Sequence, residues 1–201
     1  MTTLTLVRHG ETDWNRDRRI QGSTDIPLND VGRAQAAATA EVLRDRLASE
    51  SSLVVASSDL SRARETARII ASALGADEPR AYPSLRERNY GEAEGLDVDE
   101  FRARWGDWIG AEVPGAEPWA DVRVRAVAGI REVVRDAQRT AAPTAPSLIV
   151  VSHGALIREV IRHATAGEFP APGEKLANGS MHTFLVERDR LQLLAYSGVV
   201  V

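Results

Sequence analysis

Short, mostly apolar runs alternate along this chain with longer segments in which apolar residues recur at helical spacing. The short runs at residues 4–7, 53–56 and 148–151 have the length and composition of buried strands. The longer segments at residues 31–48 and 60–74 carry the apolar stripe of amphipathic helices. Strand and helix signals that alternate in this way predict βαβ units with parallel strands.

The second half of the chain continues the alternation. Three more elements are predicted at residues 82–85 (a brief strand), 121–138 (a helix) and 155–164 (a helix). We expect the chain to close with a hairpin of two strands, residues 183–186 and 191–195, around residues 188–190.

One region departs from this pattern. From Glu87 to about Pro118 the chain is rich in glycine and contains Trp105 and Trp108, with Trp119 just beyond. We expect a small helical or irregular cap at about residues 87–120 that leans over the sheet and belongs to a single domain spanning 1–201.

The composition is that of an ordinary globular protein, with 43% apolar and 27% charged residues. The net charge of −4 argues against an extended nucleic-acid surface. The chain has no cysteine, which excludes disulfides and thiol nucleophiles. It has neither a leader pattern nor an apolar stretch of about 20 residues, so we expect a soluble, cytoplasmic protein without a membrane partner.

Polar residues follow two of the predicted strands in a repeated arrangement. Arg8-His9-Gly10 comes after the first strand, and His153-Gly154 comes after the strand at residues 148–151. In open α/β sheets, ligands bind outside the carboxyl ends of the strands, so the two histidines are expected to share one site. Arg62, just beyond another strand, adds a second guanidinium. Two guanidiniums and two imidazoles would bind a tetrahedral oxyanion, above all phosphate.

These side chains also suggest a reaction. A neutral histidine can attack phosphorus to give a phosphohistidine, while arginines and helix N-termini stabilise the phosphoryl oxygens. The leaving oxygen needs a proton, for which Glu87 at the start of the cap is the best candidate. Each residue alone has a plainer interpretation: Glu87 as a surface carboxylate, Arg62 as a solvated helix residue. Only their combination indicates catalysis, and we interpret His163 and His182 as structural.

Other kinds of site lack their sequence patterns. The four histidines show no spacing typical of zinc ligands. Neither a phosphate-binding loop ending in Gly-Lys-Ser/Thr nor the Gly-x-Ser-x-Gly turn of serine hydrolases occurs. We therefore expect no metal and no cofactor.

Four segments resemble the motifs of the histidine phosphatase superfamily, also called phosphoglycerate mutase-like. They are LVRHGETDWN at residues 6–15, continued by QGSTDIPLN at 21–29, then SSDLSRARETA at 57–67, LRERNYGEAEG at 85–95 and VSHG at 151–154. They occur in the family's order and cover nearly the whole chain. The resemblance implies a three-layer α/β/α sandwich with a mostly parallel sheet and a small helical cap insertion.

The resemblance also implies roles for single residues. By motif match, His9 is the phosphorylated nucleophile, Glu87 is the proton donor, and Arg8, Arg62 and His153 complete the phosphate pocket. Positions that match substrate contacts are Asn15, Gln21, Gly22, Tyr90 and Gly154. No metal is needed, because arginine and imidazole supply the positive charge.

Within the family the sequence favours a phosphatase. Residues 87–91 partly resemble the mutases, but GEAEG at residues 91–95 is closer to the phosphatases, and the stretch from Glu87 to His153 is short for a mutase. We expect hydrolysis of a small-molecule phosphomonoester, such as a sugar phosphate or a phosphoglycerate derivative. The alternatives are a cofactor-dependent phosphoglycerate mutase and a non-catalytic module that binds a phosphorylated ligand. A homodimer is compatible with the sequence, which identifies no interface.

Overall fold

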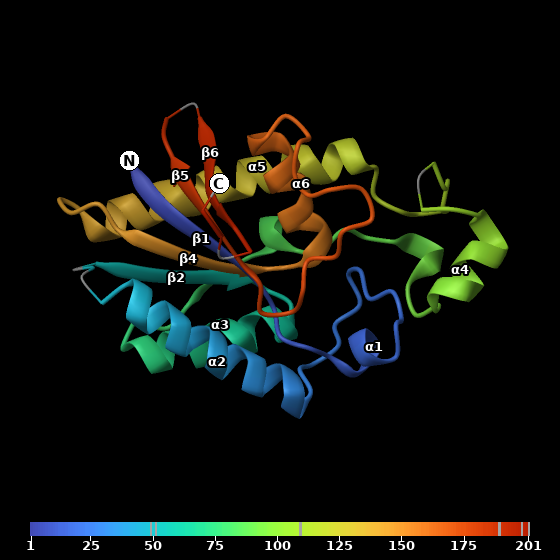
Figure 1. Cartoon of the computed structure of the whole chain (residues 1–201), viewed down its shortest axis with the longest axis horizontal. Coiled ribbons are helices and arrows are strands. Elements are labelled where there is room, and N and C mark those ends of the chain that lie inside the picture. The colour runs from blue at the N-terminus through green and yellow to red at the C-terminus, as the bar shows by residue number, and fades with distance from the viewer. Residues whose placement is uncertain (49, 51, 109, 189, 198, 201) are drawn as a thin grey trace.

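A single sheet forms the middle layer of the molecule and contains every described strand (Figure 1). The computed structural model describes residues 1–48, 50, 52–108, 110–188, 190–197 and 199–200. In order across the sheet, the strands are β3 (Arg80–Tyr82), β2 (Leu53–Ser58), β4 (Ser147–Ser152), β1 (Thr2–Arg8), β5 (Met181–Val186), β6 (Leu191–Tyr196) and β7 (Val199–Val200).

The sheet has a parallel half and an antiparallel half. Strands β3, β2, β4 and β1 pair in parallel, as βαβ units require. The pairings of β1 with β5, β5 with β6 and β6 with β7 are antiparallel. The predicted hairpin is therefore present as β5 and β6, although Asp189 at its tip lies outside the described residues. The two His-Gly pairs follow β1 and β4, which are neighbours in the parallel half.

Two helical layers cover the sheet, which confirms the expected α/β/α sandwich (Figure 1). Helices α2 (Asp30–Arg46) and α3 (Ser61–Leu74) pack on one face. Helices α5 (Trp119–Ala141) and α6 (Gly154–Ala164) pack on the other. None of the described helices is long and apolar enough to span a membrane.

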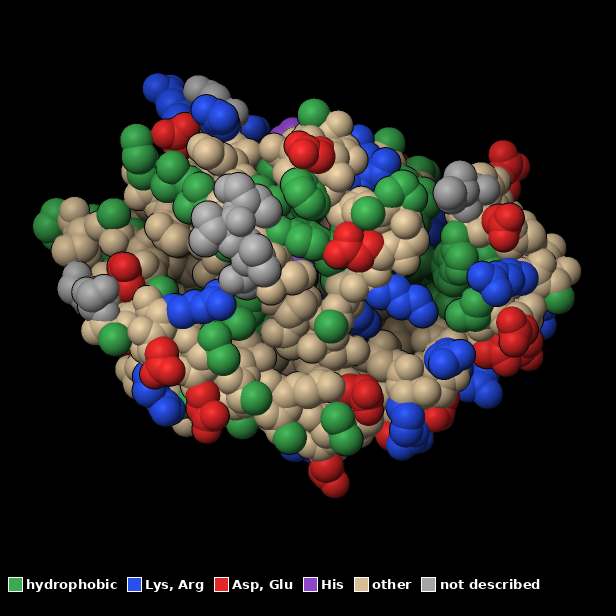
Figure 2. Space-filling model, in the orientation of Figure 1, with side chains coloured by type: hydrophobic (Ala, Val, Ile, Leu, Met, Phe, Trp, Pro, Cys, Tyr) green, Lys and Arg blue, Asp and Glu red, His purple; other side chains and the backbone are tan. Residues whose placement is uncertain are grey.

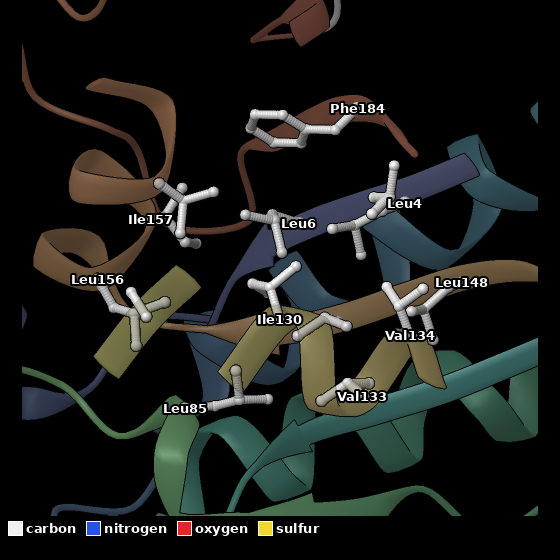
Figure 3. Close-up of a cluster of buried hydrophobic side chains, with 14 of the residues drawn as sticks. Leu4, Leu6, Leu85, Ile130, Val133, Val134, Leu148, Leu156, Ile157 and Phe184 are labelled. Atoms are coloured by element: carbon white, nitrogen blue, oxygen red, sulfur yellow. The ribbon is translucent and has the colours of Figure 1, made fainter. Parts of the chain in front are cut away.

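Alternate residues of each strand serve the two layers, because successive side chains of a strand point to opposite faces. Leu4 and Leu6 of β1 pack in the same cluster as Ile130 of α5 and Ile157 of α6 (Figure 3). Val7 faces the other way and belongs to the cluster formed with α2 and α3. Burial on both faces explains why these strands read as nearly continuous apolar runs.

The prediction of a strand at residues 82–85 is wrong. Strand β3 ends at Tyr82, and Pro83–Leu85 forms a turn of 3-10 helix. Proline has no N–H to donate to a ladder and fixes its own φ, so Pro83 turns the chain away from the sheet. The turn carries Leu85, which is fully buried, into the core cluster with α5.

Beyond Leu85, the chain that leads to α5 forms a small apolar cluster of its own beyond the carboxyl ends of β1 and β4 (Figure 1). It contains a 3-10 turn (Gly91–Ala93) and helix α4 (Val98–Trp105), whose first turn is capped by Asp97. Phe101 of α4 is buried and stacks on Trp108 with 4.0 Å between ring centroids. Ile20, from the loop after the short helix α1 (Asp13–Arg16), joins this cluster. Apolar contact thus holds the cap beside the site.

Candidate active site

Two histidines lie side by side where neighbouring strands end. Strands β1 and β4 are parallel, and Arg8 pairs with Ser152, so the residues that follow emerge at the same edge. The ring centroids of His9 and His153 are 5.1 Å apart, and their planes are tilted by 60°. Both side chains are buried. The structure thus brings together the two His-Gly pairs that the sequence placed in one site.

The ring of His9 is oriented by a backbone hydrogen bond. Its Nδ1 lies 2.6 Å from the carbonyl oxygen of Gly10, which can only accept, so Nδ1 carries the proton. The Nε2 atom is left with a free lone pair. Burial, followed by the positive charges of Arg62 and Arg8, lowers the pKa of His9 well below its usual value. His9 is therefore a neutral imidazole near pH 7, the form that acts as a nucleophile.

Arg62 is fully buried near the start of α3, where its helix position alone suggests a solvated side chain. Its guanidinium donates to the carbonyl oxygens of Thr24 at 2.9 Å and Gly22 at 2.8 Å. These two bonds fix the plane of the guanidinium, and Nε is left without a hydrogen-bond partner. Arg62 therefore places a buried positive charge at the site, and its Nε–H group has no partner among the described residues of the protein.

Several buried polar atoms around the histidines lack partners. They are Nε of Arg8, Nε of Arg62, both ring nitrogens of His153 and Oε1 of Gln21. A buried polar group without a hydrogen bond is costly, so such groups are rare and call for an explanation. Gathered donors beside two guanidiniums are satisfied together by an oxyanion. The Nε–H groups of Arg8 and Arg62 and the protonated ring nitrogen of His153 could donate to a phosphate, whereas Oε1 of Gln21 can only accept.

A cavity of about 150 Å³ opens at this point. Of the residues singled out from the sequence, its lining includes Arg8, His9, Asn15, Gln21, Gly22, Arg62, Glu87 and Tyr90. Burial and the nearby Glu87 carboxylate raise the pKa of Tyr90, so its hydroxyl remains a donor. His153 and Gly154 are not part of the lining. Instead, His153 packs against His9, and a Cβ on Gly154 would lie 3.4 Å from Nε of Arg8.

Asn15 is oriented by a partner that sequence reasoning missed. The side chain of Asn178 donates to the carbonyl oxygen of His9 at 2.9 Å and to Oδ1 of Asn15 at 3.2 Å. Oδ1 of Asn15 also accepts from the backbone N–H of Thr12. With its oxygen engaged twice, Asn15 has its amide hydrogens left to donate to a ligand in the cavity. Asn178 lies far along the chain in a loop without periodicity, so no sequence signal pointed to it.

Glu87 is bound at the N-terminus of α6. Its carboxylate accepts from the backbone N–H groups of Ala155 at 3.0 Å and Leu156 at 3.2 Å, and from that of Arg88 at 2.9 Å. We expected helix N-termini to bind the phosphate, but at α6 these donors bind the carboxylate instead. Glu87 is therefore held at a fixed position in the cavity wall, close to the segment that carries His153.

Arg125 of α5 holds the backbone that leads into Glu87. Its guanidinium donates to the carbonyl oxygens of Ser84 at 3.1 Å and Arg86 at 2.8 Å. It also forms a 2.7 Å ion pair with Glu117 at the end of the cap. In the sequence Arg125 was one of many helix arginines. Nothing in the sequence distinguishes Arg125 from the other arginines of this helix as a residue that supports the site.

Glu94 of the cap joins the loop that holds Arg62. Its carboxylate accepts from the backbone N–H groups of Ser23 at 2.8 Å, Thr24 at 2.9 Å and Tyr90 at 3.0 Å. A Cβ on Gly22, where φ is +57°, would lie 2.0 Å from Oε1 of Glu94. Glycine is therefore strongly favoured at position 22, and Glu94 supports the pocket without lining it. The GEAEG segment indicated family membership but not this contact.

The charge around the cavity comes from the protein's own side chains. In the part of the chain that the structure describes, no three His, Asp or Glu side chains cluster as a metal site would need. The cavity lining contains three guanidiniums, those of Arg8, Arg19 and Arg62, and one carboxylate, that of Glu87. Such a pocket attracts an anion and positions an ionisable carboxyl group next to it.

Comparison with known proteins agrees with this geometry. The family model described as histidine phosphatase superfamily (branch 1) matches residues 4–197. The "uncharacterized phosphatase PhoE" of Bacillus subtilis is 32% identical over 197 residues, which make up 98% of this chain and 95% of that protein. The "phosphoglycerate mutase-like protein 4" of Arabidopsis thaliana is 33% identical over 206 residues, covering 98% and 85%.

Among solved structures, a mycobacterial glucosyl-3-phosphoglycerate phosphatase in complex with VO3 is similar over 96% of this chain and 98% of its own. Its sequence identity is 29%, and the TM-score is 0.79. The similarity therefore extends over the cap as well as the sheet.

Proposed function

Because the chain belongs to branch 1 of the histidine phosphatase superfamily, and is thus a phosphoric monoester hydrolase, we propose that it hydrolyses a small-molecule phosphomonoester through a phosphohistidine. The observation that supports this most strongly is the set of buried, unpartnered atoms on Arg8, Arg62 and His153 around a neutral His9. We propose a sugar phosphate or a phosphoglycerate derivative as the substrate class.

In the first step, Nε2 of His9 attacks the phosphorus atom while the bond between phosphorus and the ester oxygen breaks. Glu87 transfers a proton to that oxygen, so the alcohol leaves uncharged. The guanidiniums of Arg8 and Arg62 donate to the phosphoryl oxygens, where negative charge is concentrated in the transition state. The Gly10 carbonyl keeps the imidazole oriented by accepting a hydrogen bond from Nδ1–H throughout.

In the second step, water attacks the phosphohistidine. Glu87, now a carboxylate, takes the proton from the water, and the bond between phosphorus and Nε2 breaks to release phosphate. His9 returns to its neutral form. Glu87 thus gives a proton in one step and takes one in the next, and three backbone N–H groups hold its side chain in the cavity wall.

Cationic side chains provide the stabilising charge in both steps, so we propose that turnover needs no metal. The test is hydrolysis of p-nitrophenyl phosphate in the presence of a chelator by the wild type and by His9→Asn. We expect turnover by the wild type only. An acid-labile, alkali-stable phosphoryl adduct should appear on the wild type after rapid quenching with a ³²P-labelled ester. Undiminished turnover by His9→Asn would overturn the proposal.

A further inference from the structure

A second pocket, of about 300 Å³, adjoins the cavity at His9. The two share Arg8, Asn15, Arg19 and Ile20 in their walls, so they lie next to each other. The outer pocket is completed by residues from three other places: Arg18 in the loop after α1, Val98 at the start of α4, and Lys175 with Asn178 in the segment between α6 and β5. A molecule whose phosphate lies at His9 would extend into this space.

The outer pocket is strongly positive. Four side chains of its lining are cations, those of Arg8, Arg18, Arg19 and Lys175, and none is a carboxylate. This concentration stands out in a chain whose net charge is −4. On the face drawn in Figure 2, Lys and Arg atoms lie beside the hollow between α1 and the loop after α6. Such a pocket raises the local concentration of anions.

These cations also lack the partners that nearby arginines have. Arg16, at the end of α1, forms ion pairs with Asp13 at 2.8 Å and Asp17 at 2.9 Å. Within the described residues, no carboxylate lies within 4.0 Å of a charged nitrogen of Arg18, Arg19 or Lys175. The pocket therefore has positive charge that the protein itself does not neutralise.

Hydrogen bonds fix one wall of the pocket to the end of β1 and the opposite wall to the cap. Next to Lys175, the buried Leu176 accepts a hydrogen bond from Arg8 through its carbonyl oxygen. On the opposite wall, Arg19 donates from Nη1 to the carbonyl oxygen of Gly95 at 2.7 Å.

The backbone of Arg18 is itself strained. Its φ of 54° lies in the left-handed region, which non-glycine residues seldom occupy. Strain of this kind persists where the surrounding structure enforces it, often at binding sites. The backbone segments that carry these cations are therefore held in place next to the cavity at His9.

Resting on the function proposed above, we infer that the substrate carries a second anionic group, which binds at Arg18, Arg19 and Lys175 while the ester phosphate lies at His9. The shared chemistry is that of a small phosphomonoester with a carboxylate or a further phosphate group. Arg8 faces both pockets and sits between the two anions. Arg18, Arg19 and Lys175 are exposed, so solvent weakens their attraction for the second group. The preference is therefore expected to be moderate and to fall with salt.

The test compares pairs of esters that differ in the second group. Each ester is measured as a competitive inhibitor of p-nitrophenyl phosphate hydrolysis, because competition reports binding whether or not the ester is itself hydrolysed. The first pair is 3-phosphoglycerate and glycerol 3-phosphate, which probes a carboxylate. The second pair is fructose 1,6-bisphosphate and fructose 6-phosphate, which probes a further phosphate.

We expect the wild type to favour the doubly anionic member of at least one pair, about tenfold, and the preferred pair identifies the group. Lys175→Gln and Arg18→Asn should each reduce that preference about threefold, and the double variant should nearly abolish it. Asparagine is chosen at position 18 because it tolerates a positive φ. Lys175→Arg, which keeps the charge, should retain most of the preference. Arg131→Gln, an exposed change on α5 outside both pockets, is the control and should leave it unchanged.

Equal affinity for both members of each pair in the wild type would overturn the inference, as would an undiminished preference in the double variant. Either result is distinct from failure of the proposed function. That failure would appear as the absence of p-nitrophenyl phosphate turnover by the wild type itself.

Discussion

The guanidinium of Arg62 donates a 2.8 Å hydrogen bond to the carbonyl oxygen of Gly22, which lies 40 positions earlier in the chain. The bond connects the start of α3 with the loop after α1, and Glu94 of the cap holds that loop from the other side. The orientation of the buried cation therefore depends on a backbone conformation that only glycine adopts easily. The site is built as much by this loop as by the strands.

Gly22→Ala should damage the site. The new Cβ would lie 2.0 Å from Oε1 of Glu94, on a residue whose φ is +57°. Either the loop or the Glu94 carboxylate that holds it must shift, and with it the acceptor of Arg62, so we expect kcat/KM to fall by about tenfold or more. Steady-state kinetics with p-nitrophenyl phosphate measures this. The matched control is Gly75→Ala, where φ is +68° but no atom lies within 4 Å. The control should lose about 1 kcal/mol of stability through its backbone alone and keep its activity.

Arg62→Lys should reduce turnover although it keeps the charge. An ammonium group cannot donate to Gly22, Thr24 and a phosphoryl oxygen in the planar arrangement of the guanidinium. Loss of an oriented donor to the transition state typically costs about 10² in kcat, and we expect a fall of that order. Arg64→Lys, an exposed change on the same helix, is the control. A kcat within about twofold of the wild type would show that Arg62 acts only through its charge.

Much of the fold and the centre of the site could be predicted from the sequence, because they depend on local patterns. The spacing of apolar residues predicts most of the strands and helices. The rules of βαβ connection then predict that the strands before the two His-Gly pairs are parallel, so that both pairs emerge at the same edge of the sheet. The strand expected at residues 82–85 failed because a short apolar run does not distinguish a strand from a turn that packs in the core. In this run, Pro83 is the sequence signal that indicates a turn and not a strand.

The parts of the site that could not be predicted depend on long-range contacts. Asn178, Glu94 and Arg125 bind backbone groups of distant segments, and no spacing in the sequence reports such contacts. Arg62 is another example, because its position on a charged helix suggested exposure, whereas the loop around Gly22 buries it. Residues that position the catalytic groups become visible only once the loops are folded together.

Stability should fall in acid because of His182, a buried residue of β5. Burial lowers its pKa from 6.5 to about 4 in the folded protein. The unfolded chain therefore binds a proton below about pH 6.5 that the folded chain does not bind until about pH 4, so stability decreases as the pH falls through this window. One such group contributes up to about 3 kcal/mol at pH 4.

Urea unfolding of the wild type and of His182→Gln, at several pH values from neutral to acid, tests this. We expect the variant to lose part of the decline between pH 6.5 and about 4. His163→Gln, an exposed change on α6, is the control for replacing a histidine. Identical pH dependence in wild type and His182→Gln would show that other groups cause the decline. His9 and His153 contribute with the same sign, because burial also lowers their pKa values.

Glu87→Gln should impair the reaction to an extent that depends on the leaving group. Glutamine keeps the size of the side chain, and its single oxygen can still accept from the N–H groups of Leu156 and Arg88. Its amide nitrogen replaces the oxygen that accepts from Ala155, and it has no acidic proton to give to the ester oxygen. An alkyl alkoxide needs that proton, whereas p-nitrophenolate is a stable leaving anion. We expect formation of the phosphohistidine to slow by about 10² or more with an alkyl phosphate and far less with p-nitrophenyl phosphate. Rapid-quench measurements separate this step from hydrolysis of the intermediate. A merely structural role for Glu87 predicts equal losses with both esters, and that outcome would remove it from the chemistry.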